Sequence, residues 1–298
     1  MCSPPLRSGL MVLVVTVLVL SAAVLTGVAW PDRAGADAAS VTGPARYLAL
    51  GGSASVGVQP TTLAPRGAPT DGGYADDLVA MEGGRWPGLV LTRLGCPGET
   101  TSTMLSGRDR CHRGRSSQLA EAVEFLRTDP SVRLVTVDLG FNDVRPCLRH
   151  RSVDTRCVAA GIDGLRRQLP VILSSLRSAA GPGVDIVGVG HYDPFLALAG
   201  QGAAGRSFAA ASLEVIEQLD AALASIYARF SIPMAGVLQA FAAVRTGAAH
   251  DAVSAEVSRT CLLTWMCARP PYGPNLHPND RGYRLMASAI AAALPPSG

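Results

Sequence analysis

The stretch that decides the fold is Tyr47-Leu48-Ala49-Leu50-Gly51-Gly52-Ser53-Ala54-Ser55-Val56-Gly57. Its apolar first half predicts a buried strand, and the glycines that follow predict an abrupt end to that strand. Ser53 therefore stands just beyond the carboxyl end of the strand, where a nucleophile could be presented. Taken by itself, the segment is more simply explained as a strand and a glycine turn, because short motifs arise often by chance.

Two more apolar runs, 88–94 and 132–139, end in the same way, at Gly95-Cys96-Pro97-Gly98-Glu99-Thr100-Thr101 and at Gly140-Phe141-Asn142-Asp143. The remaining patterns predict helices over 74–82, 116–127, 157–179, 206–229 and 279–294, and extended segments over 184–190 and 232–241. This alternation predicts one doubly wound α/β domain with a parallel sheet, whose ligands bind at the carboxyl ends of the strands. Ser53, Gly98 and Asn142 should then share one rim.

Composition supports a globular domain that does not bind nucleic acid. Of 298 residues, 48% are apolar and 16% charged, and the formal net charge is only +3. At the N-terminus, Arg7 precedes an apolar run of about 20 residues, and Ala34-Gly35-Ala36 has the form of a cleavage site. We therefore expect a signal peptide or an N-terminal membrane anchor over 1–36, a linker over 37–45 and the folded domain over 46–298.

Export gives the cysteines a structural meaning. Six of them follow the N-terminal segment, and an even number in an oxidising compartment predicts disulfides. They fall into three local couples separated by 15, 10 and 6 positions. Since none has the close spacing of a zinc knuckle, we expect no metal site. The predicted pairs are Cys96–Cys111, Cys147–Cys157 and Cys261–Cys267.

The residues at the predicted rim suit acyl transfer. Ser53 needs a base, and His277 lies in a proline-stiffened loop directly before the last helix. The developing oxyanion needs donors, which the backbone N–H groups of Ser53 and Gly98 and the side-chain amide of Asn142 could supply. His191 follows a buried strand and could line the same rim. Each residue also has an ordinary structural explanation, but four in the right order are less easily explained by chance.

In this order and spacing, Gly51-Gly52-Ser53, Pro97-Gly98-Glu99-Thr100, Gly140-Phe141-Asn142-Asp143 and His277-Pro278-Asn279-Asp280 resemble the four blocks of the SGNH (GDSL) hydrolases. The segments 94–101 and 264–267 are similar to secreted actinobacterial esterases of this family, in which three local disulfides are usual. The resemblance implies a flavodoxin-like three-layer α/β/α fold and hydrolysis of carboxylic esters through a serine acyl-enzyme. It assigns Ser53 as nucleophile, His277 as base, and Ser53, Gly98 and Asn142 as oxyanion donors.

Two positions depart from the family pattern. Gly52 stands where the first block normally has aspartate, so a carboxylate that shapes the nucleophile turn is missing. Pro274 stands three residues before His277, where the usual acid lies, and the residue two before is Asn275. We therefore expect a Ser53–His277 dyad in which a main-chain carbonyl of the preceding loop accepts the Nδ1–H of His277.

The sequence thus predicts a secreted or envelope-bound monomeric esterase or lipase that acts on a small-molecule or lipid ester without any cofactor. Two alternatives remain within the same fold. One is a carbohydrate O-deacetylase or phospholipase. The other is a non-catalytic envelope protein that binds a glycan or lipid, which the changes at Gly52 and Pro274 make conceivable.

Overall fold

Five parallel strands form the central sheet, in the order β2-β1-β3-β6-β7. In chain order they are β1 (Arg46–Gly51), β2 (Val90–Arg93), β3 (Val132–Asp138), β6 (Asp185–Val189) and β7 (Met234–Ala235). The computed structural model describes residues 43–246 and 251–296, so the predicted N-terminal segment over 1–36 lies outside the described residues. Within those ranges, no helix has both the length and the apolarity needed to cross a membrane.

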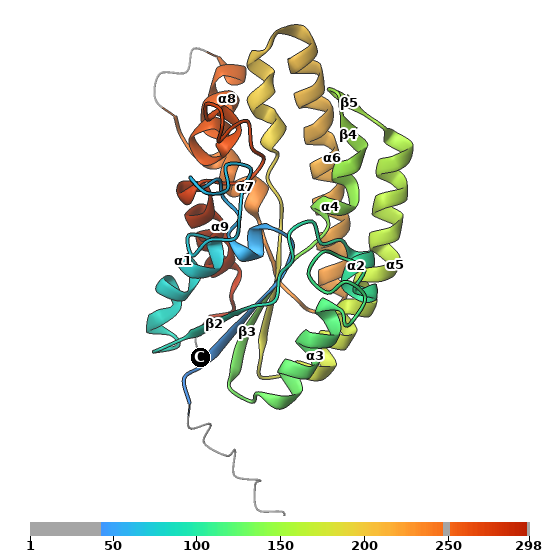
Figure 1. Ribbon diagram of the computed structural model, residues 1–298, viewed down its shortest axis with the longest axis vertical. Helices are drawn as coiled ribbons and strands as arrows, with labels where there is room; N and C mark the ends of the chain where they lie inside the picture. The colour runs from blue at the N-terminus through green and yellow to red at the C-terminus, as the bar shows by residue number, and fades with distance from the viewer. Residues whose placement is uncertain (1–42, 247–250, 297–298) are drawn as a thin grey trace, which may run out of the picture. The chain divides into compact units, whose positions relative to one another are not determined.

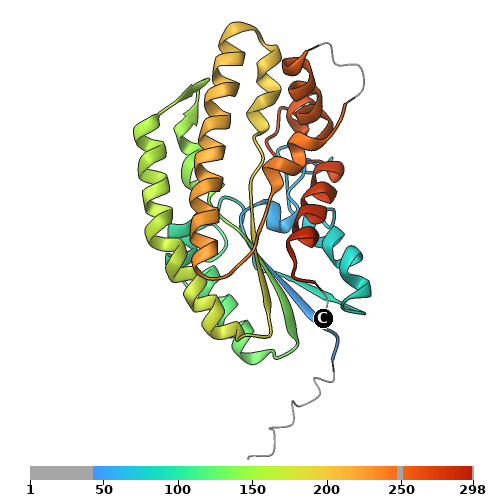
Figure 2. The ribbon, with the colours of Figure 1, turned by 180° about the vertical axis from the view of Figure 1, so that it is seen from behind.

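Helices cover both faces of this sheet, which confirms the predicted three-layer α/β/α fold (Figures 1 and 2). One layer contains α2 (Thr101–Ser106), α3 (Gln118–Thr128), α5 (Thr155–Ala180) and α6 (Gly202–Arg229). The other contains α1 (Tyr74–Met81), α7 (Val237–Ala243), α8 (Ala252–Leu263) and α9 (Asp280–Ala293). Short elements complete the described chain: α4 (Phe141–Val144), the hairpin of β4 (Leu148–Arg149) and β5 (Ser152–Val153), and the 3-10 turns η1 (Ala54–Val56), η2 (Glu82–Gly84), η3 (Arg145–Cys147), η4 (Pro194–Gly200) and η5 (Trp265–Cys267).

The alternation of side chains along each strand divides the core in two. Along β1, Leu48 and Leu50 pack into the core beneath α3, α5 and α6, whereas Tyr47 and Ala49 pack into the core beneath α1 and α9. Each of these four side chains is fully buried. The strand is therefore held from both sides, and its carboxyl end is fixed in position.

One predicted element is wrong in type. The segment expected to be extended over 232–241 is a strand only in the two residues of β7, after which α7 begins at Val237. Gly236 ends the strand, and Val237 and Phe241, four residues apart, both bury themselves in the core against α9. The four-residue spacing of Val237 and Phe241 fits one face of a helix, but Pro233 and Gly236 just before them favoured an extended segment in the sequence.

Candidate active site

Ser53 lies two residues beyond the end of β1, at the N-cap position of the turn η1. The strand must turn sharply here, and Gly51 makes this possible with a φ of 122°. A Cβ at Gly51 would lie 2.0 Å from the Asp138 carbonyl oxygen at the end of β3, so no other residue fits. The Gly52 N–H donates to the same carbonyl at 2.9 Å. The nucleophile turn is thus fastened to the neighbouring strand end.

His277 faces Ser53 across this rim. Its Nε2 lies 2.9 Å from Ser53 Oγ, and its Nδ1 lies 2.7 Å from the side-chain Oδ1 of Asn275. Oδ1 also accepts from the backbone N–H of His277 at 3.0 Å, while the Asn275 Nδ2 donates to the Arg66 carbonyl at 3.0 Å. Because a backbone N–H can only donate and a carbonyl only accept, the amide orientation follows from its partners.

This arrangement fixes the tautomer of His277. With Oδ1 as acceptor, Nδ1 must carry the proton, and Nε2 presents its lone pair to the Ser53 hydroxyl. The expectation that a main-chain carbonyl would accept this proton is therefore wrong. The acceptor is the carboxamide of Asn275, which reaches back to His277 because the pair is two residues apart in a tight loop.

The loop that carries His277 is bonded to the segment before it. Trp265 donates its backbone N–H to the His277 carbonyl at 3.0 Å, and its own carbonyl accepts from the Asn275 N–H at 3.1 Å. Trp265 lies between Cys261 and Cys267, which form a disulfide as predicted. On the other side, the Tyr192 hydroxyl donates to the Leu276 carbonyl at 2.7 Å. These contacts hold the base in place without a carboxylate.

Burial keeps His277 neutral. Desolvation, assisted by the nearby charge of Arg145, lowers the pKa of the imidazole to about 4. Near neutral pH the imidazole is therefore uncharged, and its Nε2 can accept a proton.

The expected oxyanion donors lie on the same cavity as Ser53 and His277, a hollow of about 700 Å³ whose wall includes Gly98 and Asn142. Gly98 is exposed at the turn after β2 and has a φ of 90°, a conformation that favours glycine. Asn142 donates one Nδ2 hydrogen to the Glu99 carbonyl at 3.0 Å, which leaves its second hydrogen for a ligand. This bond also ties the loop after β3 to the loop after β2.

Gln118, which the sequence did not indicate, braces the nucleophile turn from below. Its Oε1 accepts from the Gly51 N–H at 2.6 Å, and its Nε2 donates to the Gly51 carbonyl at 3.2 Å. The same Nε2 donates to the Glu99 carboxyl at 2.8 Å. Desolvation raises the pKa of Glu99 to about 7, against the opposing effect of its hydrogen bonds to Thr103 and Gln118. One buried amide thus joins the loops that carry Ser53 and Gly98.

A carboxyl group does lie beside Gly52, but it comes from β3. The Asp138 Oδ2 is 3.8 Å from the position that a Cβ on Gly52 would occupy. Desolvation raises the pKa of Asp138 to about 7, and the backbone N–H groups of Ser55 and Gly52 oppose that shift. Asp138 is therefore placed to contact the turn that the missing aspartate would otherwise shape. Its place at the end of a buried strand hid this contact from sequence reasoning.

His191 lies at the wall of the same cavity but is occupied by other contacts. Its Nε2 lies 3.0 Å from the Leu139 carbonyl, and its backbone N–H donates to the Asp220 carboxyl at 3.1 Å. Desolvation lowers its pKa to about 4, against the effect of the Leu139 hydrogen bond. His191 thus supports the wall of the cavity, and Ser53 has its partner in His277.

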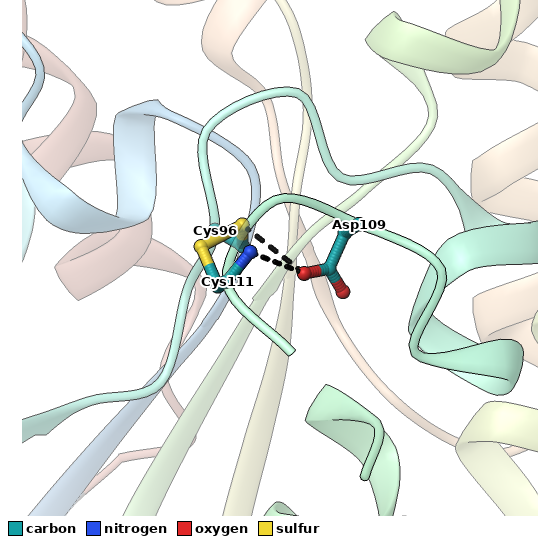
Figure 3. A group of neighbouring side chains, drawn as sticks. All are labelled: Cys96, Asp109 and Cys111. Atoms are coloured by element: carbon teal, nitrogen blue, oxygen red, sulfur yellow. Dashed lines mark hydrogen bonds between the residues drawn. A yellow bond between two sulfur atoms is a disulfide. The ribbon is translucent and has the colours of Figure 1, made fainter. Parts of the chain in front are cut away.

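The loop after Gly98 is closed by the Cys96–Cys111 disulfide, which with Cys147–Cys157 confirms the remaining predicted pairs. Figure 3 shows the Asp109 carboxylate turned toward this bridge. Its Oδ1 accepts from the backbone N–H groups of Cys111 and His112, both at 2.7 Å.

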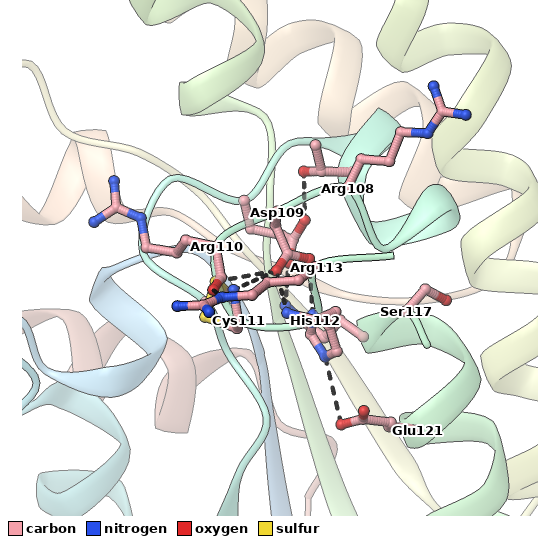
Figure 4. A network of polar contacts seen from close by, with 12 residues as sticks. Arg108, Asp109, Arg110, Cys111, His112, Arg113, Ser117 and Glu121 are labelled. Carbon is pink, nitrogen blue, oxygen red and sulfur yellow. Dashed lines mark hydrogen bonds and ion pairs between the residues drawn. A yellow bond between two sulfur atoms is a disulfide. The ribbon is translucent and has the colours of Figure 1, made fainter. Parts of the chain in front are cut away.

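His112 extends this network to α3 (Figure 4). Its Nδ1 lies 2.7 Å from Asp109 Oδ2, and its Nε2 lies 3.4 Å from Glu121 Oε2. Burial opposes a charge on His112, but these two carboxylates outweigh it and raise the pKa. Both carboxylate oxygens of Asp109 therefore accept hydrogen bonds that hold the loop after Gly98 in place.

A model of the GDSL-like lipase/acylhydrolase family matches residues 49–285. An extracellular lipase from Streptomyces rimosus superposes with a TM-score of 0.56 at 20% identity, covering 84% of this chain and 99% of that one. A phospholipase A1 from Streptomyces albidoflavus gives 0.55 at 18% identity, covering 84% and 100%. A search among curated proteins found no match. At these identities the solved structures establish a common fold.

Proposed function

Because the chain belongs to the GDSL-like lipase/acylhydrolase family, we propose that it hydrolyses carboxylic esters through an acyl-enzyme intermediate on Ser53. The observation that carries this proposal is the ordered chain of contacts from Ser53 Oγ to His277 Nε2 at 2.9 Å and from His277 Nδ1 to Asn275 Oδ1 at 2.7 Å. Such a chain is what a serine requires to become a nucleophile.

The first half-reaction forms the acyl-enzyme. Ser53 Oγ attacks the ester carbonyl as its proton passes to His277 Nε2, and the carbonyl oxygen becomes an oxyanion. The backbone N–H groups of Ser53 and Gly98 and the Asn142 amide stabilise this charge. The tetrahedral intermediate then collapses, and His277 gives the proton to the departing alcohol oxygen.

The second half-reaction reverses these roles with water. His277 takes a proton from a water molecule, whose oxygen attacks the acyl carbon. Collapse releases the carboxylic acid and returns the proton to Ser53 Oγ. Asn275 accepts a hydrogen bond from Nδ1 throughout, so the imidazole keeps its orientation in both steps. The substrates we infer are lipid or short-chain acyl esters.

The three disulfides support a site of action outside the cytoplasm. We infer that the protein is exported as a monomer, with its N-terminal segment acting as signal or anchor.

Labelling by a fluorophosphonate tests the enzyme proposal directly. Wild-type protein should be labelled and should hydrolyse short-chain esters, whereas Ser53→Ala should do neither. Ser102→Ala, which alters an exposed serine on α2, is the matched control and should be labelled like the wild type. If the wild type is neither labelled nor active on any ester, the non-catalytic binding protein becomes the better explanation.

A further inference from the structure

A second pair of polar side chains belongs to the wall of the cavity that holds Ser53. These are Asp138 and His191, which are only 7% and 5% exposed. The Asp138 Oδ1 lies 4.0 Å from the His191 Nδ1, which is too far for a direct hydrogen bond. The proposed acyl transfer uses neither side chain. Two buried polar atoms thus lie close together on the cavity wall without bonding to each other.

The other contacts of His191 determine what its Nδ1 can do. The Nε2 lies 3.0 Å from the Leu139 carbonyl, which can only accept, so the ring hydrogen is on Nε2. Desolvation lowers the pKa of the ring to about 4, against the effect of the Leu139 bond, and the ring is therefore neutral near pH 7. Within residues 43–246 and 251–296, the His191 side chain forms hydrogen bonds only through Nε2. Its Nδ1 is therefore an unused acceptor.

The carboxyl group of Asp138 supplies the complementary donor. Desolvation raises its pKa to about 7, although the backbone N–H groups of Ser55 and Gly52 favour the ionised form. Below that pH the carboxyl is mostly protonated, and it can donate as well as accept. No side chain of the described residues contributes a hydrogen bond to it. The buried carboxyl of Asp193, in contrast, accepts from the Ser212 hydroxyl at 2.7 Å.

A hydroxyl group fits this pair better than other groups do. It can donate its hydrogen to Nδ1 while its oxygen accepts from the Asp138 carboxyl, and two atoms 4.0 Å apart can both lie at hydrogen-bond distance from one oxygen. An ammonium would be repelled by Arg66, Arg110 and Arg145, which line the same cavity. An apolar group would leave both atoms buried without a partner, at a cost in binding free energy.

The pair lies beside the nucleophile turn. The Asp138 backbone carbonyl accepts from the Gly52 N–H at 2.9 Å, and the Asp138 Oδ2 lies 3.8 Å from the position that a Cβ on Gly52 would occupy. Gly52 directly precedes Ser53. A hydroxyl a few bonds away from the scissile carbonyl could therefore reach the pair while the carbonyl carbon lies at Ser53.

We propose that Asp138 and His191 form a hydroxyl-binding subsite, and that the substrate carries a hydroxyl group within a few bonds of the scissile ester. This inference rests on the proposed ester hydrolysis for its meaning in catalysis. It is tested by binding, so that the two can fail separately.

The test uses three soluble esters of similar size: ethyl butyrate, ethyl 3-hydroxybutyrate and 2-hydroxyethyl butyrate. The second carries a hydroxyl in the acyl part, and the third carries one in the alcohol part. The full-length Ser53→Ala variant, which lacks the nucleophile, is titrated with each ester at pH 6. At this pH the rings of His191 and His277 are neutral and the Asp138 carboxyl is mostly protonated. NMR of nitrogen-15-labelled histidine rings gives the dissociation constants and the resonance of His191 Nδ1.

At least one hydroxylated ester should bind about tenfold more tightly than ethyl butyrate, and it should shift the Nδ1 resonance of His191 where ethyl butyrate does not. Added to Ser53→Ala, His191→Gln retains an amide that can donate to the Leu139 carbonyl but lacks the acceptor, and it should bring the dissociation constants close together. Asp138→Leu removes the other partner and should do the same. His150→Gln makes the matched change at an exposed position outside the cavity wall and should preserve the difference.

Three results would overturn the proposal. These are equal binding of the three esters, a preference that survives His191→Gln in a protein shown by circular dichroism to be folded, or tighter binding of 2-(dimethylamino)ethyl butyrate than of 2-hydroxyethyl butyrate. The last would identify a site for a cation. If the preference is found but wild-type protein hydrolyses none of the esters and resists the fluorophosphonate, the subsite stands and the proposed hydrolysis fails. Hydrolysis without any preference in binding would have the opposite meaning.

Discussion

Replacing Asn275 by aspartate should move the acidic limb of the pH profile. The carboxylate would keep the bonds to the His277 backbone N–H and to Nδ1, now with a full negative charge 2.7 Å from the ring. It would lose the bond that Nδ2 donates to the Arg66 carbonyl, so kcat should fall at every pH, and the shift of the pKa is therefore taken from the ratio of rates at two pH values. An opposite charge at this range raises a histidine pKa by about 1 to 3 units. Starting from a pKa of about 4, the imidazole of the variant should have a pKa of about 6.

The size of the effect follows from the populations. At pH 5, a base with a pKa of about 4 is mostly unprotonated, whereas one with a pKa of about 6 is about one-tenth unprotonated. The ratio of kcat/KM at pH 5 to that at pH 8 should therefore fall about tenfold in Asn275→Asp. Asn275→Ala should likewise lower kcat at every pH. Loss of one oriented hydrogen bond costs about 1 kcal/mol and loss of two about 2 to 3 kcal/mol, which corresponds to a fall in rate of about 5- to 160-fold.

The assay is hydrolysis of a soluble short-chain ester from pH 4 to 9, with circular dichroism at each pH to establish that the protein is folded. Gln218→Glu adds the same charge on an exposed face of α6 and serves as the control. If the acidic limb of Asn275→Asp stays where the wild type has it, or if Asn275→Ala retains full kcat, Asn275 does not orient the base.

Three further predictions concern the frame around Ser53. Gly52→Asp should lower kcat/KM at pH 8 at least about tenfold, because its Cβ would lie 3.0 Å from the Asn142 amide and 3.8 Å from Asp138; restored or improved turnover would contradict this. Desolvation raises the folded-state pKa of Asp138 to about 7, so its contribution to stability is present below about pH 4 and is lost as the pH rises through about 7. Asp138→Asn should therefore remove about 2 kcal/mol of the difference between the free energies of unfolding measured in urea at pH 5 and at pH 8. An unchanged difference would count against this role of Asp138. Changing Cys96 and Cys111 together to serine should lower the free energy of unfolding by about 3 kcal/mol, measured without reductant, and a smaller loss than about 1 kcal/mol would show that the 15-residue loop is held by other contacts.

The sequence was sufficient to predict those parts of the molecule in which local residue preferences and tertiary packing favour the same structure. Leu48 and Leu50 alternate with Tyr47 and Ala49 as a strand buried on both faces requires, and the structure buries all four. The glycine-terminated strands place Ser53, Gly98 and Asn142 on one cavity because parallel strands end on the same edge.

The remaining features depend on contacts between residues far apart in the chain. Gln118 reads as an ordinary residue at the start of a helix, and only the packing of α3 beneath β1 brings its amide to Gly51. Asp138 lies in a buried strand, and its proximity to Gly52 appears only when β1 and β3 pair. Asn275 was visible two residues before His277, but whether its side chain or a main-chain carbonyl reaches Nδ1 depends on the loop geometry.

The bond from Asn275 Nδ2 to the Arg66 carbonyl makes the substrate-facing loop and the base one mechanical unit. A loop exchanged between relatives to alter selectivity would have to return a carbonyl to the same point, or the imidazole would lose its alignment. Directed evolution for new substrates at this loop should therefore select second changes near Asn275. Changes in substrate selectivity and in turnover would then occur together in this protein.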